Sequence, residues 1–405
     1  MHLNLRPALI VGLGILGMFV LGLSIPRISD LAVFALFAVG AWTTLDTSRL
    51  QAIDTLTSLL LTAFLVAFFV PSAWYGFTDP LTDLKDGFVL LLFYGSGLLW
   101  GRRTKDGIQG TWVLLALISG FTIFGALTTF TNPAKVATFL NPDRSAPNFW
   151  SPGDTVNGTV LGLYASLGLC LLPAALLWRT ADGKHHSLVR AGLLLVGGLG
   201  FASNLAMQNR SPYFALGLAF LACTLIYFQK SGGSLAKRVG GFLLRISPLL
   251  VGCLVIVIAF PDLATDLIFR RFGEQGGDTG GRVQAWVSVL QNLSNQPFGG
   301  KTIHLGGPLY AHNFWMDAAY NSGFLALLTL LLFHLAHLPS ILRFYRRNLP
   351  ALEVLAVSTI GASMFVGCMV EPILDASRLY LGATCFLLAW VKARAQAPMS
   401  STTSA

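Results

Sequence analysis

Long apolar runs separated by short polar breaks dominate the chain. Many are close to the roughly 20 residues that a helix needs to cross a bilayer, and they are continuous rather than alternating, as in 56–74, 156–178 and 354–370. Because lipid offers the backbone no hydrogen bonds, continuous apolar runs favour helices over a barrel. The pattern predicts an all-α, polytopic integral membrane protein with about 12 transmembrane helices. The predicted spans are 7–25, 31–45, 56–76, 87–101, 108–131, 156–178, 188–207, 212–228, 240–261, 323–338, 351–370 and 379–395.

Composition agrees with this pattern. Of 405 residues, 54% are hydrophobic and 11% charged, against about 25% charged in an ordinary soluble domain. One soluble core cannot hide so much apolar surface, so we expect a single polytopic membrane domain over 1–405, with a disordered tail at 396–405. The first run, 7–25, is longer than a typical signal core and lacks a small-x-small site before Arg27, so we expect a retained span.

The charges predict an orientation. If the N-terminus is cytoplasmic, most of the 27 Lys and Arg residues fall in inner segments and most of the 18 Asp and Glu residues in outer ones. The positive-inside rule then places both termini in the cytoplasm. Contact with anionic membrane lipids accounts for the net charge of +9, so no nucleic acid partner is expected.

Two predicted outer segments are much longer than a turn. The segment 132–155 contains several Pro and Gly residues and is expected to be a loop. The segment 262–322, between the ninth and tenth spans, is the largest polar insertion and is expected to carry the active site. Within it, apolar residues at helical spacing predict an amphipathic helix on the outer membrane surface; they are Val283, Trp286, Val287, Leu290 and Leu293. Glycines cluster before and after that helix, so the loop can bend around a ligand.

Three outer residues are candidates for chemistry. Arg210 lies in a short hinge between two spans, where an arginine contacts either lipid headgroups or a ligand. Arg282 begins the amphipathic helix, where a cation opposes the helix dipole, so a ligand contact is favoured. His312 precedes the tenth span, and although a lone histidine is more often structural, its ordinary pKa near 6.5 suits proton transfer.

Other titratable groups receive simpler interpretations. Asp317, with Glu274 and Asp278, is expected to be a solvated charge, and no pattern supports a metal or a cofactor. His334 and His337 are placed toward the inner end of the tenth span, away from an outer site. The five cysteines all lie in apolar runs and predict neither a disulfide nor a metal site.

The order of these features resembles the O-antigen ligase family and the related O-antigen polymerases, over roughly 195–345 by motif and elsewhere by topology. The ligase motif is His, then Asn, Ser or Gln, nine residues, Gly, two residues and a small or hydroxylated residue. It matches His312-Asn313, Gly323 and Ala326, although alanine departs from the usual last position. The family's hinge arginine matches Arg210, with Phe214 in place of a common leucine. Its loop arginine matches Arg282, followed by Trp286 and a Pro297-Phe298-Gly299 turn.

The resemblance implies a metal-independent glycosyltransferase of the bacterial inner membrane with a periplasmic active site. Such enzymes move a glycan from undecaprenyl pyrophosphate to a hydroxyl of the lipid A–core oligosaccharide. Arg210 and Arg282 would hold the pyrophosphate, because guanidinium pairs bidentately with phosphate oxygens. His312 would accept the proton of the acceptor hydroxyl. Substrate contacts are expected from a further set: Asn313, Arg270, Arg271 and Trp286.

Alternatives stay open. An O-antigen polymerase uses the same donor with a lipid-linked glycan as acceptor, and a protein O-glycosyltransferase commonly carries an added soluble domain. A secondary transporter also has about twelve spans, but transporters place charges or broken helices at mid-membrane. Here the polar mass is outside the membrane, which disfavours transport.

Overall fold

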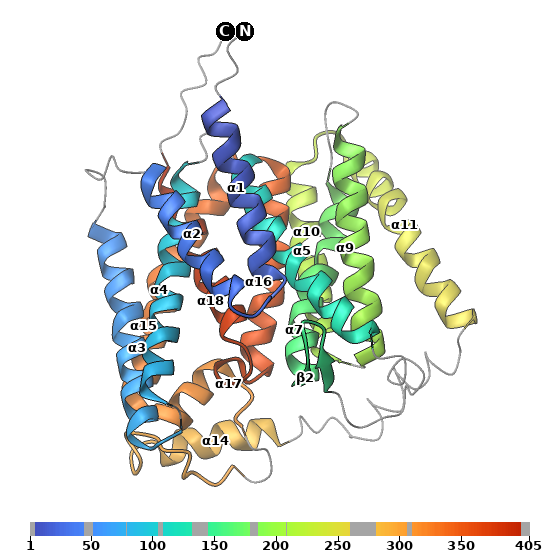
Figure 1. Ribbon diagram of the computed structural model, residues 1–405. Helices are drawn as coiled ribbons and strands as arrows, with labels where there is room; N and C mark the ends of the chain where they lie inside the picture. Colours follow the sequence, from blue (N-terminus) through green and yellow to red (C-terminus); the bar gives the residue numbers. More distant parts are fainter. Residues whose placement is uncertain are drawn as a thin grey trace.

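The chain folds into a bundle of helices (Figure 1). The computed structural model describes residues 5–43, 52–77, 79–103, 108–131, 145–178, 185–207, 209–259, 281–305 and 310–397. Its helices are α1 Leu5–Gly22, α2 Ile28–Thr43, α3 Ala52–Trp74, α4 Pro80–Arg103, α5 Ile108–Phe130, α7 Gly158–Leu169, α8 Leu171–Leu177, α9 His185–Met207, α10 Ser211–Lys230, α11 Leu235–Ala259, α14 Arg282–Asn292, α15 Phe314–Arg346, α16 Ala351–Val370, α17 Ile373–Ala376 and α18 Arg378–Gln396. A small antiparallel hairpin joins β1 Ala146–Asn148 to β2 Ser151–Val156.

The helices identify a membrane protein. Among the described residues, seven helical stretches are long and apolar enough to cross a bilayer. They are Thr55–Trp74, Thr111–Phe130, Gly158–Leu177, Ser187–Met207, Ser211–Lys230, Phe314–Arg346 and Ala351–Val370. The other predicted spans coincide with α1, α2, α4, α11 and α18, so every predicted span overlaps a helix.

Small residues let the helices approach closely. α18 packs along α4, where a Cβ on Gly97 would lie 2.3 Å from the Phe386 carbonyl oxygen, and one on Gly101 would lie 2.7 Å from the Ala393 Cβ. In lipid, such backbone proximity supplies van der Waals contact where no hydrophobic force drives helices together. The glycines of α4 therefore fix the position of α18.

One end of the bundle gathers the long connections. α14 and the β-hairpin lie at the end opposite to the start of α1 and the finish of α18 (Figure 1). The hairpin forms within 132–155, which was predicted to be entirely loop, and 132–144 lies outside the described residues. The Trp150 Nε1 donates to the Leu23 carbonyl at 2.7 Å, which ties the hairpin to the end of α1. We call this end of the bundle the outer end.

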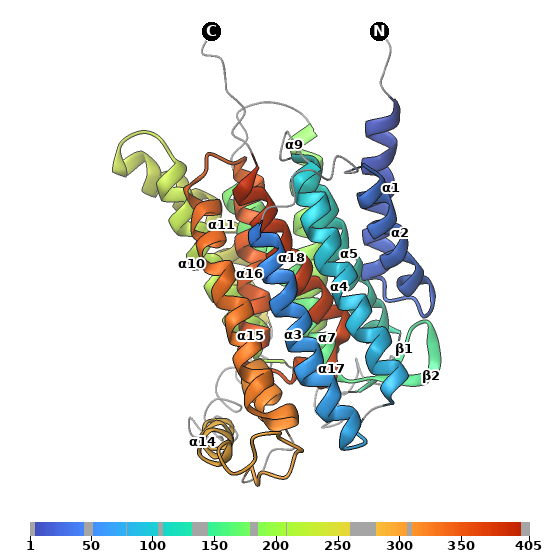
Figure 2. The same ribbon diagram turned by 90° about the vertical axis from the view of Figure 1, so that its left-hand side faces the viewer.

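α15 reverses direction at Gly323. The backbone there has φ 84° and ψ −163°, which is not helical. The rings of Phe314 and His334 nevertheless lie 5.8 Å apart, whereas twenty residues of a straight helix would separate them by about 30 Å. The piece 314–322 therefore folds back toward 324–346, and the two pieces meet at Gly323, at the end of α15 nearer to α14 (Figure 2).

This reversal corrects two predictions. The loop was expected to reach 322 and the tenth span to begin at 323; the long helical piece does start after Gly323, but residues 314–322 of the expected loop are helical. His334 was expected to lie beyond reach of an outer site, yet its ring lies 5.4 Å from that of Trp315, three residues from His312. The periodicity of 324–338 revealed the span but carried no signal for a folded-back piece.

Candidate functional site

His312 occupies a strained backbone position. Its φ is +52°, in the left-handed region that residues other than glycine seldom adopt. Directly after it, Asn313 caps α15, because its Oδ1 accepts from the Trp315 and Met316 backbone N–H groups at 3.1 and 3.2 Å. The chain thus turns at His312 into a helix whose first turn is fixed. The imidazole is held beside that helix start.

The residue before His312 is also fixed. The Trp286 Nε1 donates to the Ala311 carbonyl at 2.6 Å, and the Ala311 N–H donates to Asp317 Oδ1 at 2.9 Å. Asp317 is fully buried, so the prediction of a solvated charge was wrong. Trp286, predicted to contact substrate, contacts the backbone that carries His312. These two side chains therefore orient His312 from one side while Asn313 does so from the other.

Arg282 begins α14, as predicted, and α14 lies across the outer end. Its Nη1 donates to the Val370 carbonyl at the end of α16, at a distance of 2.8 Å. The apolar stripe of α14 points largely away from the protein, since Val283 and Leu290 are 50% and 53% exposed while Val289 is buried. This is the arrangement expected of a helix that lies on a lipid surface. The Arg282 side chain therefore points into the protein, and the exposed apolar face of α14 points away from it.

The His312 imidazole is a neutral proton acceptor at neutral pH. Burial, and secondarily the positive charge of Arg282, lower the pKa of His312 to about 4. Its Nδ1 has no hydrogen-bond partner among the described residues. An uncharged imidazole with a vacant nitrogen beside a guanidinium can accept a proton from a hydroxyl bound next to it.

Arg210 lies in a rigid hinge at the start of α10. The preceding Asn209 donates from Nδ2 to the Gly158 carbonyl at 3.0 Å. The following Ser211 donates from Oγ to Glu371 Oε1 at 2.7 Å, and Pro212 stands in the first turn of the helix. Arg210 itself is half-buried. The hinge therefore places Arg210 next along the chain to a residue, Ser211, that bonds to the residue following α16.

Two predicted residues, Arg282 and Asn313, and the neighbour of a third, Arg210, contact the outer end of α16. Asn313 Nδ2 donates to the Met369 carbonyl at 3.2 Å, Arg282 binds the next carbonyl, and Ser211 binds Glu371, the residue after that. Three consecutive positions thus receive contacts from the α10 hinge, from α14 and from the start of α15. The segment Met369–Glu371 is the hub of the candidate site.

Not every predicted residue can be placed. Arg270 and Arg271 lie outside the described residues, as does 262–280 of the predicted loop. Sequence reasoning missed the hub and the orienting role of Asp317. Glu371 directly follows the apolar run of α16, and an acidic residue at the end of a predicted span is the signal that would have identified it.

Comparison with protein-family models gives no match for this chain, and comparison with curated proteins gives none either. The site offers a neutral imidazole, a guanidinium anchored beside it and a second guanidinium held in the α10 hinge.

Proposed function

We propose that this protein is a membrane glycosyltransferase that moves a glycan from undecaprenyl pyrophosphate to an acceptor hydroxyl on the lipid A–core oligosaccharide. The observation that carries the proposal is a neutral His312, whose Nδ1 has no hydrogen-bond partner among the described residues, close enough to Arg282 for its charge to lower the pKa of the imidazole. A proton acceptor beside a cation suits a reaction in which a hydroxyl is deprotonated while a phosphate leaving group departs.

The proposed step is a direct displacement. The acceptor oxygen forms a bond to the anomeric carbon as the bond from that carbon to the pyrophosphate oxygen breaks. The hydroxyl proton passes to His312 Nδ1, and the carrier pyrophosphate leaves with the bonding electron pair. Arg282 and Arg210 stabilise the charge that develops on the leaving group, each by roughly 1.5–3 kcal/mol per charge-assisted hydrogen bond. Attack opposite the leaving group inverts the anomeric configuration.

The proposal includes a topology. We infer twelve crossings of the bacterial inner membrane, with both termini cytoplasmic and the hub facing the periplasm. In support, the basic residues Arg343, Arg346 and Arg347 stand at the end of α15 opposite Gly323, as the positive-inside rule requires of a cytoplasmic end. The exposed apolar stripe of α14 supports a membrane surface at the outer end.

Replacement of the two central residues tests the mechanism. With purified membranes and a lipid-linked donor, His312→Ala and Arg282→Ala should each lower transfer at least a hundredfold, as loss of a general base or a charge-stabilising donor does. His304→Ala, an exposed histidine of the same segment, and Arg343→Ala, an exposed arginine at the inner end, should leave transfer unchanged. Near wild-type transfer by both central variants at equal protein level would reject the mechanism.

A deletion strain separates ligase from polymerase. Loss of all long-chain lipopolysaccharide with carrier-linked polymer retained identifies a ligase. Lipopolysaccharide capped with a single repeat identifies a polymerase that extends a lipid-linked glycan. An unchanged lipopolysaccharide profile would count against both.

A further inference from the structure

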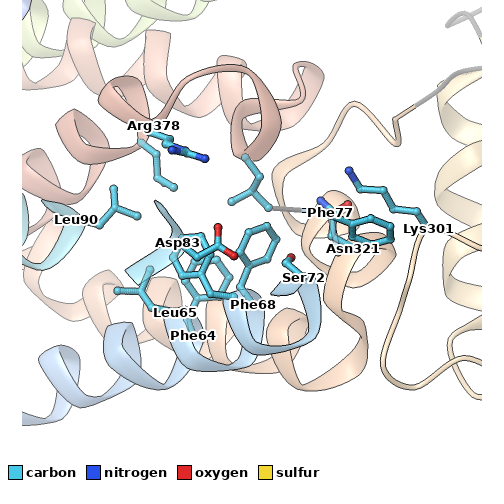
Figure 3. A pocket seen from close by; sticks show the side chains of 13 residues that line it. Phe64, Leu65, Phe68, Ser72, Phe77, Asp83, Leu90, Lys301, Asn321 and Arg378 are labelled. Atoms are coloured by element: carbon cyan, nitrogen blue, oxygen red, sulfur yellow. The ribbon is translucent and has the colours of Figure 1, made fainter. Parts of the chain in front are cut away.

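A cavity of about 130 Å³ lies where the end of α3, the start of α4 and the start of α18 meet (Figure 3), and no hub residue lines it. Its polar lining comes from four helices and one connecting segment: Ser72 near the end of α3, Asp83 near the start of α4, Asn321 of α15, Arg378 at the start of α18, and Lys301 between α14 and α15. Aromatic rings complete the wall. The cavity is thus built by the fold and not by one local segment.

The polar groups supply both donors and acceptors. Lys301 and Arg378 donate, Asp83 accepts, and the Asn321 amide does both. Hydroxyl groups also donate and accept, so a polyol can satisfy such a mixed set. Arg378 forms an ion pair with Asp86. Together with Lys301 and Asp83, this gives two positive and two negative side chains around the cavity, so their formal charges cancel. A neutral ligand fits this balance better than a free anion, which would meet the Asp83 carboxylate.

The size and the walls restrict the ligand further. An engineered apolar cavity of about 150 Å³ admits benzene, and most drug-sized pockets are at least twice as large. A hexose has about twice the heavy atoms of benzene, so a cavity of about 130 Å³ holds one side of a single ring and leaves the rest of the saccharide outside. Phe64, Phe68 and Phe77 line this cavity and offer flat apolar faces. A ring with polar edges and an apolar face, which is the form of a hexose, combines these requirements.

Ring contacts join the cavity to the candidate base. The Lys301 Nζ lies 5.8 Å from the centre of the Tyr310 ring, and the Tyr310 ring lies 6.3 Å from that of His312. A ligand held at Lys301 therefore lies on the Tyr310 side of His312. The hub lies on another side, since Met369 of α16 contacts Asn313, the residue after His312.

We propose that this cavity is a subsite for one neutral hexose ring of a saccharide. Its assignment to the acceptor glycan, whose hydroxyl is directed past Tyr310 toward His312, rests on the proposed transferase function. The binding of a sugar does not, because it follows from the cavity alone. The subsite would select the acceptor sugar while the hub selects the donor pyrophosphate.

The test measures binding without turnover. Full-length protein in lipid nanodiscs, free of glycoside detergent, is examined by saturation-transfer NMR with methyl hexosides and methyl 2-acetamido-hexosides as probes. At least one probe should show saturation transfer, and Asp83→Asn and Lys301→Met should each weaken its binding at least fivefold. Asp79→Asn and Lys85→Met are matched controls at the same end, outside the cavity lining, and should bind as the wild type does.

The outcomes separate this inference from the proposed function. If the wild type binds a sugar, the cavity variants do not, and the wild type shows no transfer activity, the subsite is upheld and the transferase is rejected. Transfer activity with no saturation signal from any probe overturns the subsite alone. Binding of inorganic phosphate or octyl phosphate, without a signal from any sugar, also overturns the subsite. A sugar signal that the cavity variants retain at wild-type strength overturns it too.

Discussion

His312 holds a left-handed backbone conformation that costs of order 1–3 kcal/mol in a residue other than glycine. The cost is borne because side chains of α14 and α15 fix Ala311, and the Asn313 side chain binds the first turn of α15. Residue type and position were enough to select His312 and Arg282 from the sequence. The burial of Asp317 could not be predicted, because it results from the reversal at Gly323 and not from neighbours along the chain.

The fall of kcat/KM at low pH, the acid limb of the pH–rate profile, should report the protonation of His312. Since the pKa of His312 is lowered to about 4, the imidazole is neutral above that value and its basic form is lost as pH falls through it. We expect wild-type kcat/KM to be flat from pH 8 to pH 5 and to fall by half near pH 4. Rate measurements on reconstituted protein across this range check the expectation.

Arg282 variants give the matched comparison. Arg282→Gln removes a charge that lowers the pKa of His312, so the acid limb of the residual activity should move to higher pH. Arg282→Lys retains the charge and should keep the limb near its wild-type position. A limb already near pH 6.5 in the wild type, or one unmoved by Arg282→Gln, would contradict this account.

At the scale of elements, the spacing from His312-Asn313 to Gly323 has a physical meaning. Asn313 starts a helix, the nine residues 314–322 form it, and Gly323 ends it by reversing the chain. A Cβ at Gly323 would lie 1.9 Å from the Pro297 carbonyl oxygen, which accepts from the Phe324 N–H at 2.8 Å. Ala326, fully buried one turn later, also leaves room for only a small side chain. The motif therefore encodes the length of the folded-back piece.

Gly323→Ala should abolish this reversal. The substitution imposes both a left-handed φ on alanine and a clash with backbone, which cannot move away as a side chain can. We expect loss of transfer even though every charged residue of the site is retained. Gly217→Ala, where a Cβ meets nothing within 4 Å, is the control. Activity of Gly323→Ala at half the wild-type level or more would show that the reversal is dispensable.

The Asn313 cap can be separated from its second contact. Asn313→Asp keeps the acceptor for the Trp315 and Met316 N–H groups but cannot donate to Met369. Asn313→Ala loses both and should cost about 1 kcal/mol of stability more than Asn313→Asp. Thermal unfolding in nanodiscs measures the difference. Equal unfolding temperatures for the two variants would rule out a stabilising cap.

Across the whole molecule, the sequence predicted the helices well and their meeting points poorly. Crossing a bilayer imposes about 20 apolar residues on each span, and this local requirement can be read from hydropathy alone. The meeting of Ser211, Arg282 and Asn313 at the end of α16 depends on how helices pack, which apolar composition does not encode. The positions of the candidate residues on the outer side were predictable, but the hub was not.

The inner end of the bundle is locked by a buried ion pair. Arg394 Nε donates to Glu353 Oε1 at 2.7 Å, with side chains 5% and 0% exposed. Glu353→Gln leaves the guanidinium buried without its counter-charge and should lower stability by roughly 3 kcal/mol. Asp30→Asn breaks the Lys85–Asp30 pair, whose side chains are 57% and 39% exposed, and should change stability by less than about 0.5 kcal/mol. Denaturant unfolding of the two variants compares them, and equal losses would contradict this role.

The reversal at Gly323 also bears on the competition between transfer and hydrolysis. The ring contact of His334 with Phe314 brings the start of the folded-back piece level with a residue eleven positions beyond Gly323, about 16 Å along the helix. His312, two residues earlier, is thereby drawn in from the outer end and is half-buried. Water competes with a sugar hydroxyl for any activated glycosyl donor, and a recessed base reduces its access. A chain with this reversal should therefore spend few donor molecules on hydrolysis, and free glycan released per glycan transferred becomes a direct measure of how well the fold-back is formed.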